Sequence, residues 1–475
     1  MRLLITFSLS TFSFFLFLFP LFSFSQSLFF NTYGTTVAEE RAFDMVILDD
    51  GSVITIGDRY ETASFERTGY LLKVDADGNE EWNRQLTSNA ELYGTTICQL
   101  PNGNVFVAGY DYDVPNQNFG IVVAEYNETN GLPVYQKTHE FAQDAEAKDV
   151  IPMPDNGAIV LSTFENSSTK TIMLVRFNST GDTVWTKLVD PFAGDESPRE
   201  MALLTNGIVI TGSVHSGSTD NVFALMTDLN GNIQWQEEYT SSGIEFGESI
   251  AEIPSGGFYI AGTSNAIGSG GLDLLAMKID ATGQLIWATD FGRNGSELGY
   301  DIATMPDGGA VLTGSAYKAD TSGFRDLALI RIDASGDEIW TSYFGNVRGE
   351  TGYEVQIDGN QIVVCGKADV NNSEDVIVIR ADFNGNANVG INDIETSVAW
   401  NIYPNPFTEQ LTVRLTDVLT EPIALRITDI SGRVVLKTIV HRTENIDVST
   451  LRSGIYFASL RIGQLNKSRV LIKTD

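Results

Sequence analysis

The chain has 475 residues, two cysteines, three histidines and a formal net charge of −32 at pH 7. An acidic surface of this kind repels nucleic acid and anionic membranes, because both carry the same sign of charge. Cys98, Cys365 and the scattered histidines form no cluster with metal-ligand spacing, and a disulfide between the cysteines is not expected. From residue 398 onward, ten Lys or Arg residues stand against seven Asp or Glu residues, which marks the last segment as a separate module.

The first segment of the chain is typical of a secretory signal. Arg2 provides a short positive region, an apolar run covers residues 3–22, and small residues lead to a predicted cleavage after Ser25. The apolar run is long enough to span a membrane, so a permanent anchor is the alternative. We expect residues 1–25 to act as a signal peptide.

From residue 26 the chain repeats one phrase about every fifty residues, a period typical of propellers, solenoids and arrays. Each copy has an acidic residue or Asn, then a Gly, and an aromatic residue four positions after the Gly. The aromatic residues are Trp82, Tyr135, Trp185, Trp235, Trp287 and Trp340, and a seventh copy has Val389 instead. We interpret the aromatic residue as a packing group between adjacent sheets, not as a ligand contact.

One unit, residues 299–345, divides into four short strands with a turn signal at each joint. Strands are expected at 300–305, 310–313, 326–332 and 338–344, and no segment of the unit has a helical period. The Pro-Asp-Gly-Gly run at 306–309 predicts the first hairpin, because Pro restricts φ and Gly adopts positive φ. Four strands in each of seven units predict an all-β fold, with a seven-bladed β-propeller over residues 26–390.

The two ends of the repeat array are complementary. Residues 29–34 match the fourth strand of a unit, as in residues 287–292, whereas the last unit lacks a fourth strand. We therefore predict that the N-terminal strand completes the seventh blade. This pairing would remove two open sheet edges, which are prone to aggregation.

Alignment of the units on their first hairpins superposes one polar residue near the start of each first strand, the strand that lines the channel of a propeller. These residues are Asp44, Thr96, Asp149, Glu200, Ser249, Asp301 and Glu354. In one interpretation each carboxylate accepts hydrogen bonds from amides of its own or the next blade. In the other, the five acids form a ring that binds a basic group or a cation, of which Ca²⁺ is one possibility. No other cofactor is expected.

No catalytic constellation stands out in the sequence. It contains no His-Glu-x-x-His motif, no Gly-x-Ser-x-Gly at a strand-to-helix turn, no phosphate loop and no dinucleotide fingerprint. We expect a non-enzymatic binding or adhesion protein that takes an extracellular glycan or protein through its variable loops. The alternative is a polysaccharide-acting glycosidase or lyase, because a propeller scaffold can position paired carboxylates.

After a predicted linker at residues 391–400 the period ends, and residues 401–475 predict a small β-sandwich. Its landmarks are Tyr403, Pro404, Asn405, Pro406, Gly432, Arg433, Gly454, Ile455, Tyr456 and Lys473. These landmarks resemble the type A C-terminal sorting domain of the type IX secretion system of Bacteroidetes. The resemblance implies that the secretion machinery is a partner and that the protein is released or attached to the outer cell surface. An ordinary accessory β-domain is the alternative.

Overall fold

A computed structural model describes most of the chain. The described residues are 27–86, 91–113, 118–166, 169–241, 243–266, 271–292, 295–317, 324–345, 349–370, 373–387, 400–415, 423–429, 433–440, 443–462 and 465–474. The predicted signal segment and nearly all of the predicted linker lie outside these residues. The chain divides into two units, one up to Asn388 and one from Val389 onward. Within the described ranges, no helix has the length and apolar character needed to cross a membrane.

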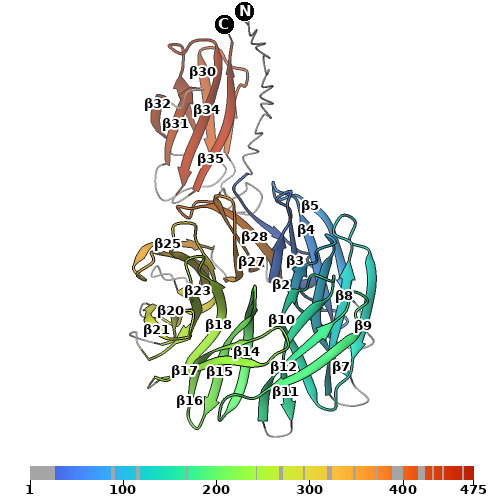
Figure 1. The fold of residues 1–475 in the computed structure, drawn as a ribbon. Coiled ribbons are helices and arrows are strands. Elements are labelled where there is room, and N and C mark those ends of the chain that lie inside the picture. The colour runs from blue at the N-terminus through green and yellow to red at the C-terminus, as the bar shows by residue number, and fades with distance from the viewer. Residues whose placement is uncertain are drawn as a thin grey trace, which may run out of the picture. The chain divides into compact units, whose positions relative to one another are not determined.

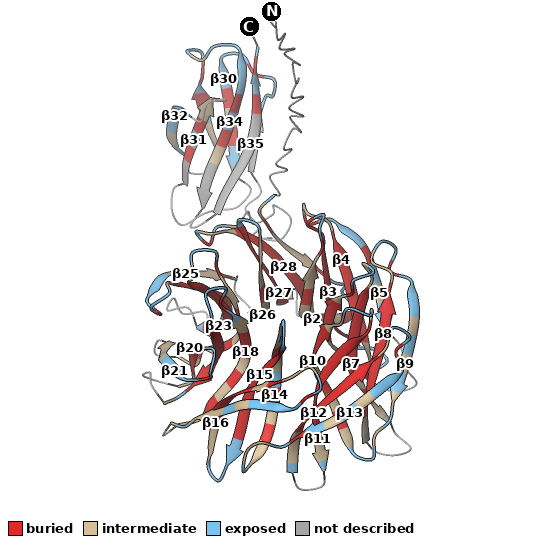
Figure 2. Ribbon diagram, in the orientation of Figure 1, coloured by how far each residue is buried: buried red, intermediate tan, exposed pale blue. Residues whose placement is uncertain are grey.

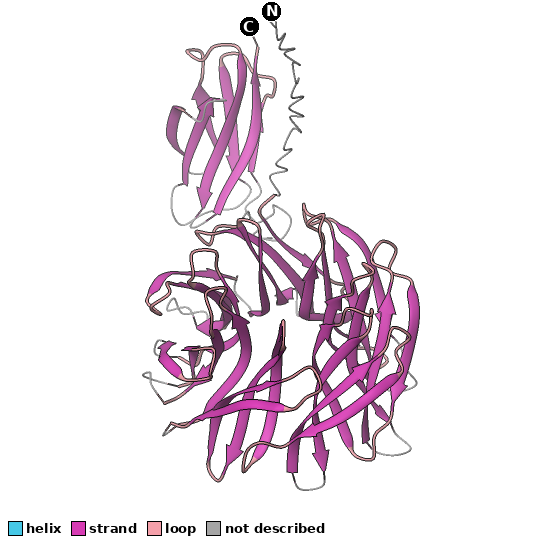
Figure 3. Ribbon diagram, viewed as in Figure 1, coloured by secondary structure: helices cyan, strands magenta, loops and turns pink. Residues whose placement is uncertain are grey.

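The described part of the first unit consists of seven four-stranded antiparallel sheets (Figures 1 and 3). Sheet 1 contains β2 (Ala38–Ile47), β3 (Val53–Glu61), β4 (Glu66–Val74) and β5 (Glu80–Leu86). Sheet 2 contains β6 (Leu92–Gln99), β7 (Val105–Asp113), β8 (Asn118–Tyr126) and β9 (Pro133–His139). Sheet 3 contains β10 (Asp144–Pro152), β11 (Ala158–Asn166), β12 (Thr169–Phe177) and β13 (Thr183–Val189).

The remaining sheets of the first unit follow the same plan. Sheet 4 contains β14 (Asp195–Leu204), β15 (Gly207–Ser216), β16 (Thr219–Thr227) and β17 (Ile233–Tyr239). Sheet 5 contains β18 (Glu245–Glu252), β19 (Phe258–Ser264), β20 (Asp273–Ile279) and β21 (Leu285–Phe291). Sheet 6 contains β22 (Leu298–Thr304), β23 (Ala310–Tyr317), β24 (Arg325–Ile332) and β25 (Glu338–Phe344). Sheet 7 contains β26 (Glu350–Asp358), β27 (Gln361–Val370), β28 (Ser373–Asp382) and β1 (Phe29–Tyr33).

Burial changes systematically from the inner to the outer strand of each sheet (Figure 2). Second and third strands such as β23 and β24 are almost entirely buried, whereas the fourth strands alternate between exposed and partly buried residues. A strand covered on both faces needs a continuous apolar run, and a strand at the outer edge needs apolar residues on only one face. The pattern of apolar residues in each unit therefore indicates which strands are covered and which lies at the outer edge. The seven sheets together form an all-β, propeller-like unit.

Apolar contacts between neighbouring sheets hold the first unit together. Each of seven buried clusters combines side chains from two successive sheets, and one of the seven joins sheet 7 to sheet 1. The repeated aromatic residues contribute at the outer strands. Trp82, for example, lies against the turn glycine Gly131 of the next sheet, and Trp340 lies against Gly385. These glycines have positive φ, and a Cβ at either position would collide with the indole ring.

The N-terminal strand β1 pairs with β28 as the outermost strand of sheet 7. Phe29 pairs with Arg380 in the same way that the repeated aromatic Trp340 pairs with Arg331 in sheet 6. Phe29 is buried and lies against Gly78 of sheet 1, so this phenylalanine takes the place of the aromatic residue that the seventh repeat lacks.

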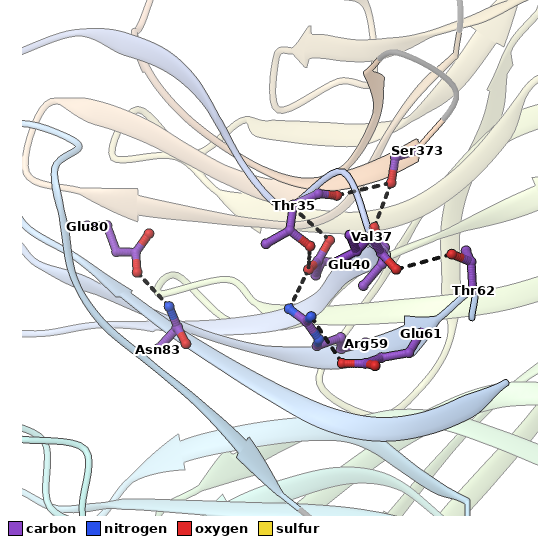
Figure 4. A network of polar contacts seen from close by, with 10 residues as sticks. Thr35, Val37, Glu40, Arg59, Glu61, Thr62, Glu80, Asn83 and Ser373 are labelled. Carbon is purple, nitrogen blue, oxygen red and sulfur yellow. Dashed lines mark hydrogen bonds and ion pairs between the residues drawn. The ribbon is translucent and has the colours of Figure 1, made fainter. Parts of the chain in front are cut away.

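Polar contacts surround the turn that follows β1 (Figure 4). The hydroxyl of Thr35 donates to Glu40 at 3.0 Å, and Arg59 of β3 donates to the same carboxylate at 2.7 Å. Ser373 of β28 donates to the carbonyl of Ala38 at 2.6 Å. Glu40 is fully buried, so these donors satisfy a charge that would otherwise be costly to bury. The first strand of sheet 1 is thus fastened to the third strand of sheet 7.

The second unit consists of two sheets that share one apolar core. One sheet contains β29 (Trp400–Tyr403), β30 (Gln410–Leu415) and β33 (Thr443–Asp447). The other contains β32 (Val434–Val440), β31 (Ile423–Asp429), β34 (Gly454–Ile462) and β35 (Leu465–Lys473). Phe407, Leu411, Ile427 and Leu471 are buried in the common core, as in a small β-sandwich.

Candidate functional site at the channel

A β-bulge in the first strand of every sheet of the first unit builds the candidate site. The pairing with the second strand shifts by one residue immediately before Asp44, Thr96, Asp149, Glu200, Ser249, Asp301 and Glu354. We call these seven the ring residues; they are the residues that the hairpin alignment superposes. The extra residue that each bulge inserts comes just before them, and we call these the bulge residues: Phe43, Thr95, Lys148, Arg199, Glu248, Tyr300 and Tyr353.

The bulge residues and four of the ring residues line one cavity of about 570 Å³. All seven bulge residues contribute to its lining, so every sheet of the first unit supplies at least one side chain. Four of the five predicted acids, Asp44, Asp149, Glu200 and Glu354, line it as well. Asp301 is buried with 3% exposure and does not belong to the lining. The cavity therefore lies where the seven first strands converge.

Three of the ring acids bond to the backbone of the next sheet. Asp44 accepts from the amide of Ile97 at 2.9 Å, Asp149 from Met201 at 2.8 Å, and Asp301 from Val355 at 2.6 Å. The same three carboxylates also accept from the amide that follows them in their own strand. This is the geometry of the first sequence interpretation, in which the acids fasten one blade to the next.

The other ring positions extend this chain of bonds between sheets. Thr96 donates to Asp149 at 3.1 Å, and the hydroxyl of Ser249 donates to Asp301. Gln356, two positions after the ring residue of sheet 7, donates to the carbonyl of Met45 in sheet 1 at 2.8 Å. Polar bonds near the cavity thus link successive sheets, and one of them links sheet 7 with sheet 1.

Burial raises the pKa of all five ring carboxyls. The pKa of Asp44 rises to about 7, first through burial and then through the charge of Asp149, and the pKa of Asp149 rises to about 6. Burial and neighbouring ring acids raise the pKa of Glu200 and Glu354 well above the ordinary glutamate value. The acids therefore repel one another as they ionise, as carboxylates that share a site do.

These raised pKa values predict that the protein is more stable in mild acid. A carboxyl whose pKa is higher in the folded chain than in the unfolded chain stabilises the fold below the unfolded pKa, and this stability is lost as the pH rises through the folded pKa. We expect the melting temperature to fall by several degrees between pH 5 and pH 8, measured by circular dichroism. Asp44→Asn should make this decline shallower, whereas exposed Asp182→Asn should leave it unchanged. An Asp44→Asn profile parallel to that of the wild type would contradict the assignment.

Apart from Thr95, the bulge residues that line the cavity are of two chemical kinds, aromatic and charged. Phe43, Tyr353 and Tyr300 come from three successive sheets, and their ring centroids lie 5.4 and 5.0 Å apart in edge-to-face contacts. We call these three residues the aromatic arc. On other sheets, Arg199 pairs with Glu248 at 3.3 Å and Lys148 pairs with Glu146 at 2.8 Å. The alignment on hairpins did not single out these residues, although each directly precedes an aligned position.

The described residues of the first unit contain no set of side chains arranged to coordinate a cation. Across the described ranges of the chain, no group of three His, Cys, Asp or Glu side chains is arranged to hold a metal ion. Asp44, Asp149 and Asp301 instead accept hydrogen bonds from backbone amides. Both cysteines are free and buried, in agreement with the expectation from the sequence.

The landmarks of the second unit have structural roles. Asn405 accepts from the amide of Ile472 at 2.8 Å, and the buried Lys473 donates to the carbonyl of Thr408. The Tyr456 hydroxyl donates to the carbonyl of Arg452 at 2.7 Å, and Arg433 pairs with Asp429 at 3.2 Å. The remaining landmarks are Tyr403 and Ile455, which are exposed, Pro404 and Pro406, which both follow cis peptide bonds, Gly454, whose φ is 154°, and Gly432, which lies outside the described residues.

Comparison with known families identifies the second unit. Residues 401–474 match the family described as secretion system C-terminal sorting domain. The match contains every landmark residue, and it supports the predicted resemblance to type IX sorting domains. Such a domain indicates that the protein interacts with the type IX secretion machinery and is exported. Fold and sorting domain together define the class of this chain: an exported, propeller-like protein.

Matches to the first unit are more distant. Regulatory protein FlaEY of Caulobacter vibrioides is 26% identical over 106 residues, which cover 20% of this chain and only 11% of that protein. The solved polysaccharide lyase Uly1 is 9% identical, with a TM-score of 0.49 over 74% of this chain and 91% of that chain. The β-propeller domain of the Trilobed protease from Pyrococcus furiosus is 11% identical, with a TM-score of 0.42 over 75% and 99% of the two chains. Identities this low transfer no ligand or activity.

Proposed function

We propose that this chain is a non-catalytic binding protein of the cell exterior, built as a closed seven-bladed β-propeller that takes its ligand at the mouth of the channel cavity. The pairing of β1 with β28 and the apolar cluster between sheets 7 and 1 support ring closure. The sorting domain supports an extracellular location, with the protein released or attached to the outer surface. An extracellular glycan or protein is the ligand class that fits this location.

The aromatic arc beside the cavity is the observation that carries this proposal. A volume of about 570 Å³ is within the range of ligand pockets, and those pockets are lined by aromatic side chains with a few polar groups. Tyr300 and Tyr353 remain partly exposed although aromatic side chains of this size gain from burial. The bulges hold them at the cavity instead of in the cores between the sheets. A ligand would cover this remaining apolar surface.

Arrays of glycans and extracellular proteins, probed with the purified protein, test this proposal. For a ligand found in this way, we expect Tyr300→Ala and Tyr353→Ala each to weaken binding about tenfold, which corresponds to about 1.4 kcal/mol. Phe65→Ala, which removes a 70% exposed ring from a surface loop, is the matched control and should bind as the wild type does. Binding that survives both tyrosine changes but fails in the Phe65 variant would place the site on the variable loops.

A glycosidase or lyase is the second candidate. One observation favours it: the pKa of Asp44, raised to about 7 in a cavity, suits a group that both gives and takes a proton near neutral pH. On this candidate, polysaccharides in the array would be cut and Asp44→Asn would abolish the cutting. We favour binding because the sequence contains no catalytic motif and the aromatic arc lies at the same cavity. Release of new sugar chain ends by the wild type but not by the Asp44→Asn variant would establish that the protein is an enzyme.

A further inference from the structure

The charges that line the channel cavity do not balance. The lining contains five acids, which are four ring residues and the bulge residue Glu248, against the two bases Lys148 and Arg199. Each base is already paired with a bulge or surface acid, since Arg199 bonds Glu248 and Lys148 bonds Glu146. The four ring acids therefore have no basic partner in these pairs. As they ionise, the cavity attracts cations and repels anions, in a protein whose net charge is −32.

The aromatic arc has a shape that suits the stem of a cationic side chain. The planes of Phe43 and Tyr353 meet at 63°, and those of Tyr300 and Tyr353 meet at 70°. Rings inclined in this way form a curved wall and not the flat platform on which a sugar ring stacks. Aromatic rings attract ammonium and guanidinium groups, and the attraction is strongest where water is excluded.

The order of residues along the first strands places the two features side by side. Each bulge residue directly precedes a ring residue, as Tyr353 precedes Glu354, so the aromatic arc and the ring acids line neighbouring parts of one cavity. A lysine or arginine side chain fits this arrangement, because an apolar stem carries its charge at the tip. A sugar within a polymer is attached at two positions and enters such a channel less easily than a side chain attached at one.

We propose that the cavity binds a lysine or arginine side chain of a basic polypeptide, with the stem against the aromatic arc and the charged group at the ring acids. This inference rests on the proposed binding function and names the ligand for the same site. A negative field around the whole first unit would speed the approach of such a polypeptide. The partner is thus a protein or peptide with an exposed basic segment.

Two peptides that differ only in charge test the inference: tetralysine amide and the same peptide acetylated on every lysine side chain. Binding to the purified protein is measured by fluorescence anisotropy at pH 8 and 0.15 M salt. We expect the charged peptide to bind at least about tenfold more tightly than the acetylated one. At this pH its ammonium groups are charged, and Asp44 and Asp149, with pKa values raised to about 7 and about 6, are ionised. Equal binding of the two peptides would overturn the inference.

Variants distinguish binding of tetralysine at the cavity from its general attraction to an acidic protein surface. Glu200→Gln removes a ring carboxyl with little change of shape, and exposed Glu66→Gln removes a carboxyl elsewhere on the surface. We expect Glu200→Gln and Tyr353→Ala each to weaken tetralysine binding about tenfold, and Glu66→Gln to change it less than twofold. Equal losses in the two glutamate variants would show surface attraction only and would contradict the proposal. Thermal melts of each variant establish that the chain is folded.

The pH dependence provides a second readout. The pKa of Asp149 is raised to about 6 and that of Asp44 to about 7, so both carboxyls lose protons between pH 5 and pH 8. Lysine stays charged over this range, and tetralysine binding should therefore strengthen as the pH rises. Glu248, Lys148, Arg199 and Tyr300 face the same cavity, and the tyrosine pKa is raised by burial, so it does not ionise in this window. Binding that weakens toward pH 8 would contradict a role for the ring acids.

A tetramer of glucosamine, which also carries ammonium groups, distinguishes a basic glycan from a basic polypeptide. Tighter binding of this sugar than of tetralysine, with the same sensitivity to Tyr353→Ala, would overturn the polypeptide assignment. If an array ligand depends on Tyr300 and Tyr353 but neither cationic probe competes with it, this inference fails and the proposed channel function stands. If no ligand responds to the tyrosine changes, the proposed function itself fails.

Discussion

Deletion of residues 27–34 is expected to abolish cooperative folding of the first unit. The deletion removes β1, leaves the edge of β28 unpaired and takes Phe29 and Tyr33 out of the cluster between sheets 7 and 1. Loss of one buried aromatic side chain costs about 3–5 kcal/mol, and a whole domain is stable by only about 5–15 kcal/mol. Calorimetry should show no cooperative transition, and size-exclusion chromatography should show aggregates.

A point variant tests a smaller part of the same loss of stability. Phe29→Ala leaves the pairing of β1 in place but removes the ring that lies against Gly78, so we expect a loss of about 3 kcal/mol. Phe65→Ala, which removes an exposed ring of the same size, should change the stability by less than about 0.5 kcal/mol. A deletion variant that melts at the wild-type temperature would refute the closing role of β1.

Gly262→Ala is expected to be strongly destabilising although it adds a single methyl group. Gly262 of β19 pairs with Gly247 just before the bulge of sheet 5, and a Cβ there would overlap the carbonyl oxygen of Phe246. The collision is with backbone, so no side chain can turn away to relieve it. We expect a loss of about 3 kcal/mol or more, measured by urea unfolding, because overpacking at a site that cannot relax is strongly destabilising.

Sheet 3 contains a natural control for this substitution. Its equivalent residue is Ser162, which pairs with Ala147 and is fully buried, so this sheet already accepts a Cβ at that position. Ser162→Ala should therefore cost little, and it removes a hydroxyl that has no hydrogen-bond partner. If Gly262→Ala were as mild as Ser162→Ala, close approach of the backbones at the bulges would not be the reason for glycine.

Most of the local structure could be predicted from the sequence because it depends on neighbours in the chain. The strands expected at 310–313 and 338–344 are observed within β23 and β25, and Gly308 has the positive φ that its turn requires. Turn residues and apolar runs act over a few positions, so one unit reveals them. The seven ring residues could be predicted in the same way, because the seven repeat units can be aligned on their first hairpins.

The chemistry of the cavity could not be predicted in this way. Phe43, Tyr300 and Tyr353 each precede a ring acid in the sequence, but this pattern does not show that their rings lie in contact at one cavity. A bulge adds one residue to a strand, which shifts the alternation of faces and turns a neighbouring residue toward the channel. That shift depends on pairing with a second strand and is invisible in the strand alone.

The sequence by itself determined the repeat, the strands, the turns and the sorting domain, because each of these depends on contacts within one unit or on a motif. Only the tertiary structure decided that Arg199, Glu200 and Tyr353 meet at one cavity and that Phe43 and Tyr353 lie in contact. Such contacts join residues hundreds of positions apart, and they arise when seven sheets pack side by side. The residue spacing within one unit does not indicate which side chains of different sheets lie close together.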